Sequence, residues 1–349
     1  MRAARFYNKK DMRVEEIDVP ELKENQVKIR VAWTGICGSD LHEYLAGPMT
    51  IPGDGPDPLT GQDRPITMGH EYSGVVEEIG SNVDNISIGD RVAVNPLITG
   101  GIAEDGLTDM YQGFTFYGLG AEGGFADYSV VDAKNVINVG DTPLKLAATV
   151  EPVAVAVQAV RESEMKFGES VAIYGAGPIG LAQILAVKAA GAKDIFVFDL
   201  SEERLEIARK IGATHAINSG ETDPVEFIKN YYPFGVDRTF EVAGVPITLE
   251  QSIKSTRPRG KVTIVSIFEK PFEFNPMILT ATGVNIASSL AYEDDIFKIT
   301  QHLISTGQID PNEIITGLIE LEDIVENGFE ELSNNKSQAK ILVKLSGED

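Results

Sequence analysis

The first part of the chain alternates hydrophobic and polar residues over short segments. Val27–Val31 alternate with a period of two, as the residues of a half-buried strand do. Segments 72–80 and 90–94 are also strand-like, and clusters of Gly, Pro, Asn and Asp separate them. We therefore expect residues 1 to about 150 to form an antiparallel, barrel-like β domain.

From Glu151 onward the pattern predicts helices alternating with strands. Helices are expected over 151–166, 181–190, 202–211 and 224–231. Strands are expected over 170–174, 194–198, 215–218, 238–242 and 260–267. This alternation predicts βαβ units and a parallel sheet, so the expected fold class is α/β with a separate β domain. The length of 349 residues agrees with two domains, because one core rarely grows beyond about 250–300 residues.

A long segment rich in Gly, Pro and Asp runs from Ala46 to Arg64. It separates two short segments, 35–42 and 69–71, that carry metal-binding residue types. We interpret it either as a surface loop near the mouth of the site or as a plain connector.

Composition excludes several classes of partner. The chain has 53 acidic and 30 basic side chains, a formal net charge of -23, which repels nucleic acid and anionic membrane surfaces. Its single cysteine excludes an intrachain disulfide and fits a reducing compartment. The N-terminus lacks the apolar core of a signal peptide, and no apolar run reaches the about 18–20 residues that span a bilayer. We expect a soluble, cytoplasmic enzyme that binds neither nucleic acid nor membranes.

Two short segments predict a catalytic zinc site. Cys37 lies in Gly-Ile-Cys-Gly-Ser-Asp-Leu-His at 35–42, and His70 is followed by Glu71. Thiolate, imidazole and carboxylate are the ligands that Zn²⁺ prefers, and a catalytic site needs only three from the protein. An isolated cysteine is more often a small buried hydrophobe. Here, however, two of the four histidines of the chain lie in these segments.

A glycine-rich loop predicts a dinucleotide site. Gly175, Gly177 and Gly180 follow an expected strand and open an expected helix, which is the context that gives the motif meaning. The first glycine permits a tight turn, the second a close approach of the pyrophosphate, and the third close packing of helix on strand. The pyrophosphate would lie at the positive end of the helix dipole. An ordinary turn is the alternative.

The residues after the next strand predict the choice of cofactor. Asp199 ends that strand, where an acidic side chain hydrogen-bonds the adenosine ribose and repels a 2′-phosphate. This favours NAD over NADP, although a helix N-cap is an alternative role for Asp199. Arg204 lies on the following helix, where we expect it to border the adenine rather than to bind a 2′-phosphate. The predicted cofactor-binding residues are Gly175, Gly177, Pro178, Ile179, Gly180, Asp199 and Arg204.

Six motifs in a fixed order resemble those of the zinc-dependent medium-chain alcohol dehydrogenases. Besides the motifs above they are Gly-Asp-Arg-Val at 89–92, Gly-Gly-Phe-Ala-Asp-Tyr at 123–128 and Glu-Pro at 151–152. The resemblance covers essentially the whole chain. Within the family, the loop at 55–61 resembles the 2,3-butanediol dehydrogenases, also called acetoin reductases. The Glu-Pro pair is shared with polyol dehydrogenases such as sorbitol dehydrogenase.

The resemblance implies a division of the chain into three segments. A GroES-like β-barrel catalytic domain is expected over 1–151 and a Rossmann NAD-binding domain with a doubly wound parallel sheet over 152–290. Residues 291–349 are expected to return to the catalytic domain. The resemblance also implies a homo-oligomer, either a dimer or a tetramer, with Val284–Tyr292 as the expected subunit contact.

The resemblance implies roles for the site residues. Cys37 and His70 would be zinc ligands, and either Glu71 or Glu151 would be the third. Asp40 would accept a hydrogen bond from His70. Ser39 would receive the alcohol proton and His42 would pass it toward solvent; without the resemblance they would be a turn residue and an ordinary helix residue. The implied catalytic residues are Cys37, Ser39, His42, His70, Glu71 and Glu151.

One family feature is missing from the sequence. Most zinc-dependent members carry a second, structural zinc held by four cysteines, whose spacing would fall near Thr99, Ile102, Asp105 and Gly113. None of these is cysteine. We expect one catalytic zinc per subunit and no structural Cys₄ zinc.

The expected activity is hydride transfer between NAD(H) and a vicinal diol or hydroxyketone. The resemblance favours the small molecules 2,3-butanediol and acetoin, with reduction of diacetyl. A polyol dehydrogenase of the sorbitol type or a threonine dehydrogenase is the alternative. Zinc-free medium-chain reductases lack the Cys37, His70 and Glu151 set, and a non-catalytic NAD-binding scaffold is a distant alternative.

Overall fold

The computed structural model describes residues 1–100, 113–335 and 337–348. Contacts within the chain divide it into two compact units. The first unit combines Met1–Glu151, Glu293–Thr306 and Ile315–Asp349, and the second combines Pro152–Tyr292 and Gly307–Ile314. The observed division differs from the expected uninterrupted return over 291–349 in one segment. Gly307–Ile314 groups with the second unit, because its short helix η3 (Asn312–Ile314) contacts α4 (Pro178–Ala189) and α5 (Glu202–Ile211).

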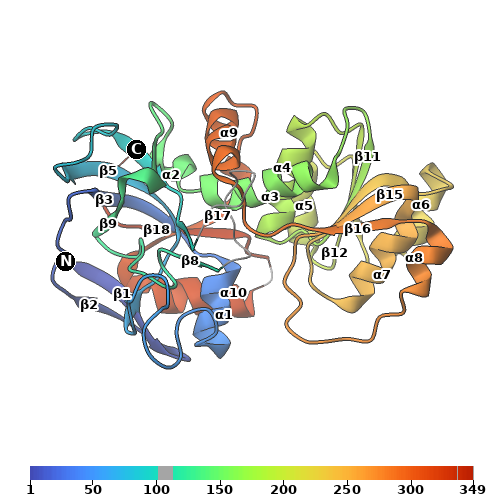
Figure 1. The fold of residues 1–349 in the computed structure, drawn as a ribbon. Coiled ribbons are helices and arrows are strands. Elements are labelled where there is room, and N and C mark those ends of the chain that lie inside the picture. The colour runs from blue at the N-terminus through green and yellow to red at the C-terminus, as the bar shows by residue number, and fades with distance from the viewer. Residues whose placement is uncertain (101–112, 336, 349) are drawn as a thin grey trace. The chain divides into compact units, whose positions relative to one another are not determined.

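A seven-stranded sheet forms the centre of the first unit (Figure 1). The strand order is β10-β6-β5-β3-β18-β17, with β9 also paired to β3, and every pair is antiparallel except β17–β18. The strands are β3 (Gln26–Gly35), β5 (Glu71–Ile79), β6 (Arg91–Val94), β9 (Tyr128–Asp132), β10 (Val136–Asn138), β17 (Ile315–Glu320) and β18 (Lys340–Lys344).

Strand β3 illustrates how the sequence pattern produces this sheet. Its first half alternates between buried and half-buried residues, as Val27–Val31 predict, and its second half is buried throughout. Full burial of the second half means that both faces of the sheet are covered there, whereas one face of the first half stays partly accessible. Apolar side chains from this sheet and from the segments around it form one continuous core.

Two smaller sheets and several short helices complete the first unit. One sheet has the order β2-β1-β4, and β7 pairs with β8. The strands are β1 (Arg2–Asn8), β2 (Asp11–Glu16), β4 (Ile66–Thr67), β7 (Leu97–Thr99) and β8 (Phe114–Phe116). The helices are α1 (Gly38–Ala46), η2 (Ala133–Asn135), α2 (Leu144–Ala147), α9 (Asp294–Ser305), η4 (Leu321–Asp323), η5 (Ile324–Glu330) and α10 (Glu331–Asn334). Helix α3 (Val150–Ser163) begins in the first unit and continues into the second.

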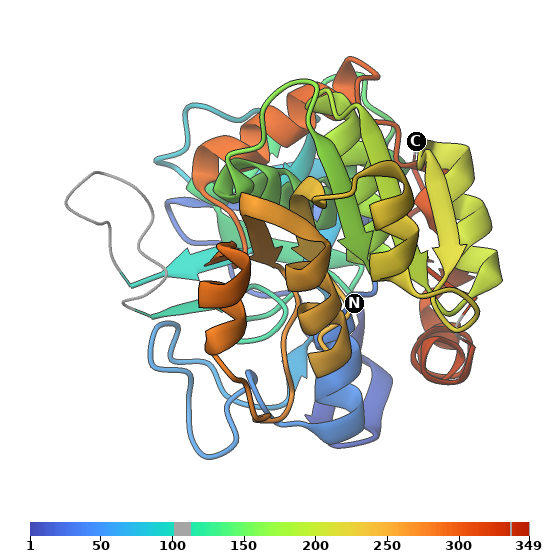
Figure 2. The same ribbon diagram turned by 90° about the vertical axis from the view of Figure 1, so that its right-hand side faces the viewer.

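The second unit contains a six-stranded parallel sheet in the order β13-β12-β11-β14-β15-β16. Helices α4 and α5 pack together on one side, and α6, α7 and α8 pack on the other (Figures 1 and 2). The strand order reverses between β11 and β14, which makes this a doubly wound sheet and confirms the predicted fold class. The strands are β11 (Ser170–Tyr174), β12 (Asp194–Asp199), β13 (His215–Asn218), β14 (Val236–Glu241), β15 (Thr256–Ile264) and β16 (Asn285–Ser288), and the remaining helices are α6 (Pro224–Tyr231), α7 (Pro246–Ser255) and α8 (Met277–Thr282).

The elements expected in this unit match the structure best where periodicity is strong. Strands β11 and β13 and helices α5 and α6 have the predicted bounds. Helix α4 begins at Pro178, three residues before the predicted start, because proline fits the first helical turn and Gly177 is the N-cap. Strand β15 begins at Thr256 and ends at Ile264, earlier at both ends than predicted. Within the described residues, the helices include none with the length and hydrophobicity that crossing a bilayer requires.

Candidate active site

The pairing of β3 with β5 brings the two predicted metal-binding segments together. In the register of these strands Gly35 lies opposite Glu71. Cys37 follows β3 as the N-cap of α1, and His70 immediately precedes β5. Segments about thirty residues apart in the chain therefore end at the same edge of the sheet.

Three donor atoms converge at this edge. Among the described residues, a sulfur, a nitrogen and an oxygen from Cys37, His70 and Glu71 lie within 4.8 Å of one another. His70 and Glu71 are buried and Cys37 is half-buried. Thiolate, imidazole and carboxylate at this separation fit a zinc ion, and the partly accessible cysteine leaves one side of the group open.

Asp40 connects the two segments from one side. Its buried carboxylate accepts a hydrogen bond from the Cys37 backbone N–H at 2.9 Å through Oδ2. Its Oδ1 lies 3.3 Å from Nδ1 of His70, an ion-pair contact that is not aligned as a hydrogen bond. Burial lowers the pKa of His70, but the charges of Asp40 and Cys37 outweigh it and raise that pKa well above its usual value. The other ring nitrogen, Nε2, is directed toward Ser39, with Oγ 3.2 Å away.

Lys340 connects the same segments from another side. Its Nζ donates to both carboxylate oxygens of Glu71 at 2.7 Å and to the carbonyl of Ile36 at 3.0 Å. Burial lowers the pKa of Lys340, but the charges of Glu71 and Cys37 raise it to a net value above normal, so the side chain stays cationic. A carboxylate has about four acceptor positions, so this contact does not prevent Glu71 from binding a metal.

Glu151 lies outside the group of three donors, as far as the described part of the chain shows. It is 6% exposed in the first turn of α3, and its charge also raises the pKa of Lys340. The structure thus places both candidate carboxylates near Lys340. It brings only Glu71 within 4.8 Å of Cys37 and His70.

Helix α1 carries both residues of the predicted proton relay. Ser39 and His42 are half-buried and three positions apart, so they lie on the same side of the helix. The Ser39 hydroxyl contacts His70, which puts it at the edge of the donor group. Its position fits a hydroxyl that exchanges a proton with a ligand bound there.

The glycine-rich loop has the shape that the motif predicts. Gly175 has φ +107°, and a Cβ there would lie 3.1 Å from the backbone nitrogen of Ala243. A Cβ on Gly180 would lie 2.0 Å from the carbonyl oxygen of Gly175, so only glycine allows α4 to start this close to β11. Around Gly177, by contrast, a Cβ would meet nothing within 4 Å. That open space, at the N-terminus of α4, fits the close approach of a pyrophosphate.

Asp199 is attached to this loop. Its carboxylate accepts from the backbone N–H of Ala176 at 2.6 Å and from that of Ser201 at 2.8 Å. The helix cap considered as an alternative role belongs to Ser201, whose Oγ accepts from the N–H of Arg204. Arg204 is half-buried, and burial lowers its pKa. The nearby carboxylate of Asp199 raises the same pKa by a smaller amount.

Comparisons with known proteins decide the family. A model of the GroES-like domain of alcohol dehydrogenases matches residues 23–141, and a model of zinc-binding dehydrogenases matches residues 178–305. An (R,R)-butanediol dehydrogenase of Bacillus subtilis (strain 168) is 44% identical over 99% of this chain and 99% of its own. The chain belongs to the zinc-dependent alcohol dehydrogenase family.

Two further similarities agree with the family. An (R,R)-butanediol dehydrogenase of Neisseria gonorrhoeae is 38% identical over 98% of this chain and 99% of its own. The crystal structure of 2R,3R-butanediol dehydrogenase from Bacillus subtilis superposes with a TM-score of 0.92 and 43% identity, covering 98% of this chain and 99% of that one. The predictions of the family, of its two domain types and of a dehydrogenase are confirmed. Zinc and a nicotinamide dinucleotide are the cofactors that this membership supports.

Sequence reasoning missed Lys340. A lysine within the apolar run Ala339–Val343 was the available signal, because a charged residue in a buried strand needs a partner. Its partner, Glu71, lies 269 positions away in the sequence and could not be identified without the fold.

The segment of the missing structural zinc is only partly described. Thr99 ends β7, and Gly113 immediately precedes β8. Ile102 and Asp105 lie outside the described residues.

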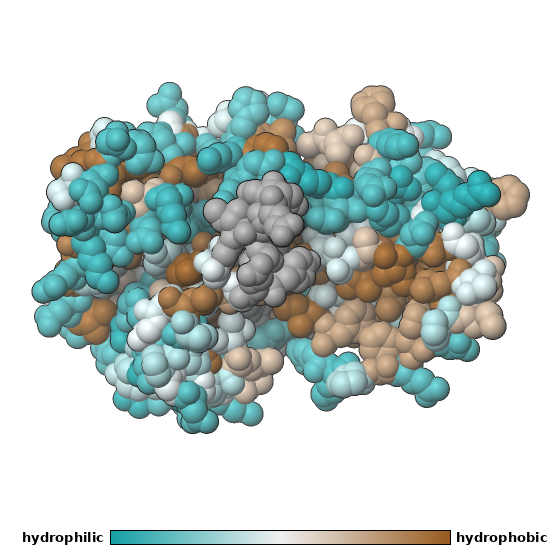
Figure 3. All heavy atoms as spheres, in the orientation of Figure 1, coloured by the Kyte–Doolittle hydropathy of each residue, from teal (hydrophilic) through white to brown (hydrophobic). Residues whose placement is uncertain are grey.

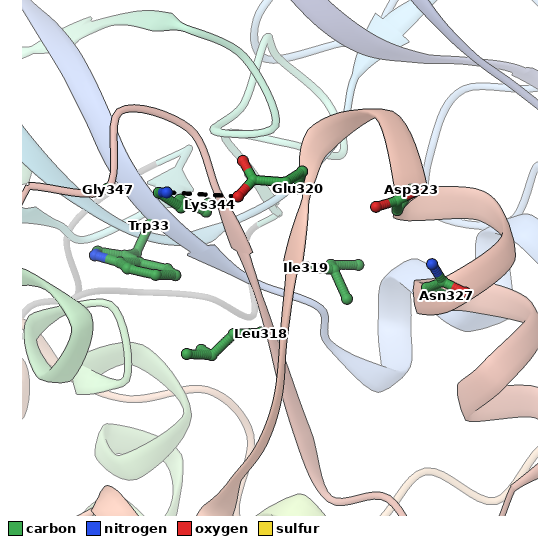
Figure 4. A pocket seen from close by; sticks show the side chains of 8 residues that line it. All are labelled: Trp33, Leu318, Ile319, Glu320, Asp323, Asn327, Lys344 and Gly347. Carbon is green, nitrogen blue, oxygen red and sulfur yellow. Dashed lines mark ion pairs between the residues drawn. The ribbon is translucent and has the colours of Figure 1, made fainter.

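A separate pocket lies along β17 in the first unit (Figure 4). Leu318 and the ion pair of Lys344 with Glu320 line it, together with Trp33. The residues around this pocket include none of the predicted site residues.

Proposed function

We propose that this chain is an NAD-dependent zinc dehydrogenase that interconverts 2,3-butanediol and acetoin and reduces diacetyl. The observation that carries the proposal is the convergence of Cys37, His70 and Glu71 beside the Ser39 hydroxyl. The similarity to two butanediol dehydrogenases over nearly the whole chain supports the substrate.

In this proposal Cys37 and His70 hold the zinc, with a third ligand from Glu71 or Glu151. When bound, zinc acts as a Lewis acid toward the substrate oxygen, and NAD exchanges a hydride with the carbinol carbon. Asp40 fixes the His70 ring by its contact with Nδ1, which leaves Nε2 for the metal. Lys340 offsets part of the negative charge that the carboxylates and the thiolate bring to the site.

Oxidation of an alcohol removes a hydride from carbon and a proton from the hydroxyl. Ser39 accepts that proton while its own hydroxyl proton moves on toward solvent, because its Oγ lies at the edge of the donor group. His42, one helical turn away, passes it toward solvent, since an imidazole with a usual pKa near ~6.5 exchanges protons readily at neutral pH. In the reverse direction the same residues deliver a proton to the carbonyl oxygen.

Asp199 and the single cysteine support two further proposals, the preference for NAD and the number of zinc ions. Asp199 favours NAD over NADP, because a carboxylate at the end of β12 repels a 2′-phosphate. One zinc per subunit is proposed, because a chain with a single cysteine cannot supply a Cys₄ site. The use of NAD(H) and a single free thiol agree with a cytoplasmic location.

A homo-oligomer, either a dimer or a tetramer, is also proposed. Strand β16 is an edge strand of the six-stranded sheet and lies within the expected contact segment. Figure 3 shows hydrophobic surface over the region where Figure 1 labels α7, α8 and β16. Met277, the first residue of α8, is 64% exposed, and Leu290, within the expected contact segment, is 38% exposed. Among the described residues the outer edge of β16 has no strand partner, and such an edge together with exposed apolar side chains is a typical surface for a second copy of the same chain.

The test is NADH-linked activity on acetoin, diacetyl and the separate isomers of 2,3-butanediol, before and after removal of zinc by a chelator. The expected result is chelator-sensitive turnover of these substrates that returns when zinc is added. Sorbitol and L-threonine are the comparison substrates, because both represent the alternative specificities.

Three other results of this activity test would each change a different part of the proposal: the substrate, the zinc mechanism or the enzymatic role. Chelator-sensitive activity on sorbitol or threonine alone would keep the mechanism and replace the substrate. Activity that persists after verified loss of metal would contradict the zinc mechanism. Binding of NADH without turnover of any of these substrates would favour the scaffold alternative.

A further inference from the structure

The backbone that carries the proposed zinc ligand His70 is held by a second segment, residues 118–125. All three carbonyl oxygens of residues 67–69 accept hydrogen bonds of 2.7–2.9 Å from the backbone N–H groups of residues 123–125. Residues 68–70 belong to no helix or strand, so regular secondary structure does not fix them. The direction in which the His70 side chain leaves the backbone therefore depends on this contact between two irregular segments.

Glycine allows the two segments to lie this close together. A Cβ on Gly118 or on Gly123 would overlap the carbonyl oxygen of Gly69. Gly69 has φ +92°, in the left-handed region that favours glycine. The backbone immediately before His70 is thus packed main chain against main chain on the side of residues 118–125.

Glu122 and Arg5 hold the start of the His70 segment. Oε2 of Glu122 accepts from the N–H of Thr67 at 2.9 Å, and both carboxylate oxygens lie 2.6–2.7 Å from Nη1 of Arg5. In the register of β1 with β4, Arg5 lies opposite Thr67. It donates to the Thr67 hydroxyl at 3.1 Å and to the carbonyl of Pro65. One ion pair thus binds three polar groups of this segment.

We propose that Glu122 is a positioning residue for His70, a role that rests on the proposed zinc site. Glu122 acts through the backbone and not by contact with the metal, because its carboxylate is engaged by Arg5 and Thr67. Its own N–H donates to Oε1 of Gln62 at 2.9 Å, which fixes Glu122 itself.

The consequence of losing this carboxylate follows from its contacts. The N–H of Thr67 would lose its charged acceptor and Arg5 its partner, and hydrogen bonds to charged groups are stronger than neutral ones. The start of the segment would loosen, and the imidazole three residues later would be held less closely beside the other two donor atoms. A metal site is sensitive to such a change, because ligands that are oriented in advance bind the ion more tightly.

The test measures the affinity of the metal-free full chain for Zn²⁺ by competition with a fluorescent chelator. Glu122→Ala should weaken Zn²⁺ binding by about tenfold, the lower end of the range for residues that orient metal-binding histidines, because Glu122 acts through Thr67. Glu122→Gln retains an oxygen for the Thr67 N–H but not the charge, so it should weaken Zn²⁺ binding by less than about threefold.

A second measurement separates the positioning of His70 from a general loss of stability. Co²⁺ bound in the same site absorbs visible light, and the spectrum depends on the geometry of its ligands. Glu122→Ala should change this spectrum. A variant that is only less stable should give the normal spectrum once it is loaded with Co²⁺.

The ion pair of Arg30 with Glu77 provides the matched control. It joins β3 and β5 in the same unit at 2.7 Å, and its side chains are 29% and 33% exposed. Glu77 lies six residues along β5 from Glu71, roughly 20 Å from the donor group. Glu77→Ala should leave Zn²⁺ affinity within about twofold of normal and the Co²⁺ spectrum unchanged.

A second variant keeps the test informative if Glu122→Ala fails to fold. Arg5→Lys retains the cation but loses the forked contact with Pro65 and Thr67. It should weaken Zn²⁺ binding by a few-fold and change the Co²⁺ spectrum in the same direction.

The positioning role would be overturned by a Zn²⁺ affinity equal to that of Glu77→Ala, or by an unchanged Co²⁺ spectrum, in the Glu122→Ala protein or its Arg5→Lys substitute. Failure of the unchanged chain to bind Zn²⁺ would contradict the proposed zinc site, and the role of Glu122 with it. The two failures are distinguishable, because the second appears before any substitution is made.

Discussion

The ammonium group of Lys340 lies 2.7 Å from both carboxylate oxygens of Glu71, and both side chains are shielded from solvent. Replacing Lys340 by Met leaves a buried carboxylate without its cation. We expect the free energy of unfolding to fall by about 3–5 kcal/mol, measured by urea denaturation of the metal-free protein. The double variant Lys340→Met with Glu71→Gln should recover much of this loss, because it removes the unpaired charge.

A second lysine on the same strand is the control. Lys344 pairs with Glu320 at 3.5 Å, but the two side chains are 43% and 56% exposed (Figure 4). Lys344→Met should therefore change the free energy of unfolding by less than about 1 kcal/mol. Similar losses in the two variants would show that burial does not set the strength of the Lys340 contact.

Replacing Cys37 by Ala should remove zinc and turnover together while leaving NADH binding intact. The thiolate is the softest ligand of the proposed set, and Cys37 belongs to the first unit whereas the glycine-rich loop belongs to the second. Zinc per chain, measured by atomic absorption, and NADH fluorescence titration test the two halves of this prediction. His302→Ala changes an exposed histidine of the first unit and should leave zinc content unchanged.

Zinc content also separates the two candidate third ligands. The resident ligand is the one of Glu71 and Glu151 whose change to Gln lowers the metal content. A Cys37→Ala protein that retains both zinc and activity would refute the ligand assignment.

Periodicity predicted the elements of the second unit well because each βαβ segment repeats a local pattern. The bounds of α5 and β11 follow directly from residues close together in the chain. The contacts that organise the site are different, since Asp40 reaches His70 in the other metal-binding segment, and Lys340 binds Ile36 and Glu71 from 304 and 269 positions away.

Replacing Asp199 by Asn should relax the discrimination between NAD and NADP. The amide oxygen can still accept from the N–H of Ala176, so the glycine-rich loop keeps this contact, while the negative charge and the acceptor for the N–H of Ser201 are lost. We expect the ratio of kcat/KM for NAD to that for NADP to fall by about tenfold, as one lost repulsive contact predicts. Glu203→Gln, which neutralises an exposed acid on α5, is the control for a general change of charge. An unchanged ratio in the Asp199 variant would place cofactor choice elsewhere.

Two buried tyrosines predict a loss of stability at high pH. Burial, together with the hydrogen bond to Glu330, raises the pKa of Tyr44 to about 12, and burial raises the pKa of Tyr117 to about 12. Because a tyrosine in an unfolded chain ionises near ~10, the folded state disfavours the phenolate. The stability from this difference is complete below about pH 10 and is lost as the pH rises toward about 12.

Urea denaturation at a series of pH values between 9 and 12, with tyrosine ionisation followed by absorbance, measures this effect. Tyr117→Phe removes one of several tyrosines whose pKa is raised by burial and should make the decline in unfolding free energy with pH shallower, even though it also loses the hydrogen bond from the Asp132 N–H. Tyr231→Phe, at a position that is 53% exposed, is the control and should leave the decline as it is. An equally steep decline in the Tyr117 variant would mean that other groups, such as the buried Tyr72 and Tyr174 or lysines losing their charge, cause the alkaline unfolding.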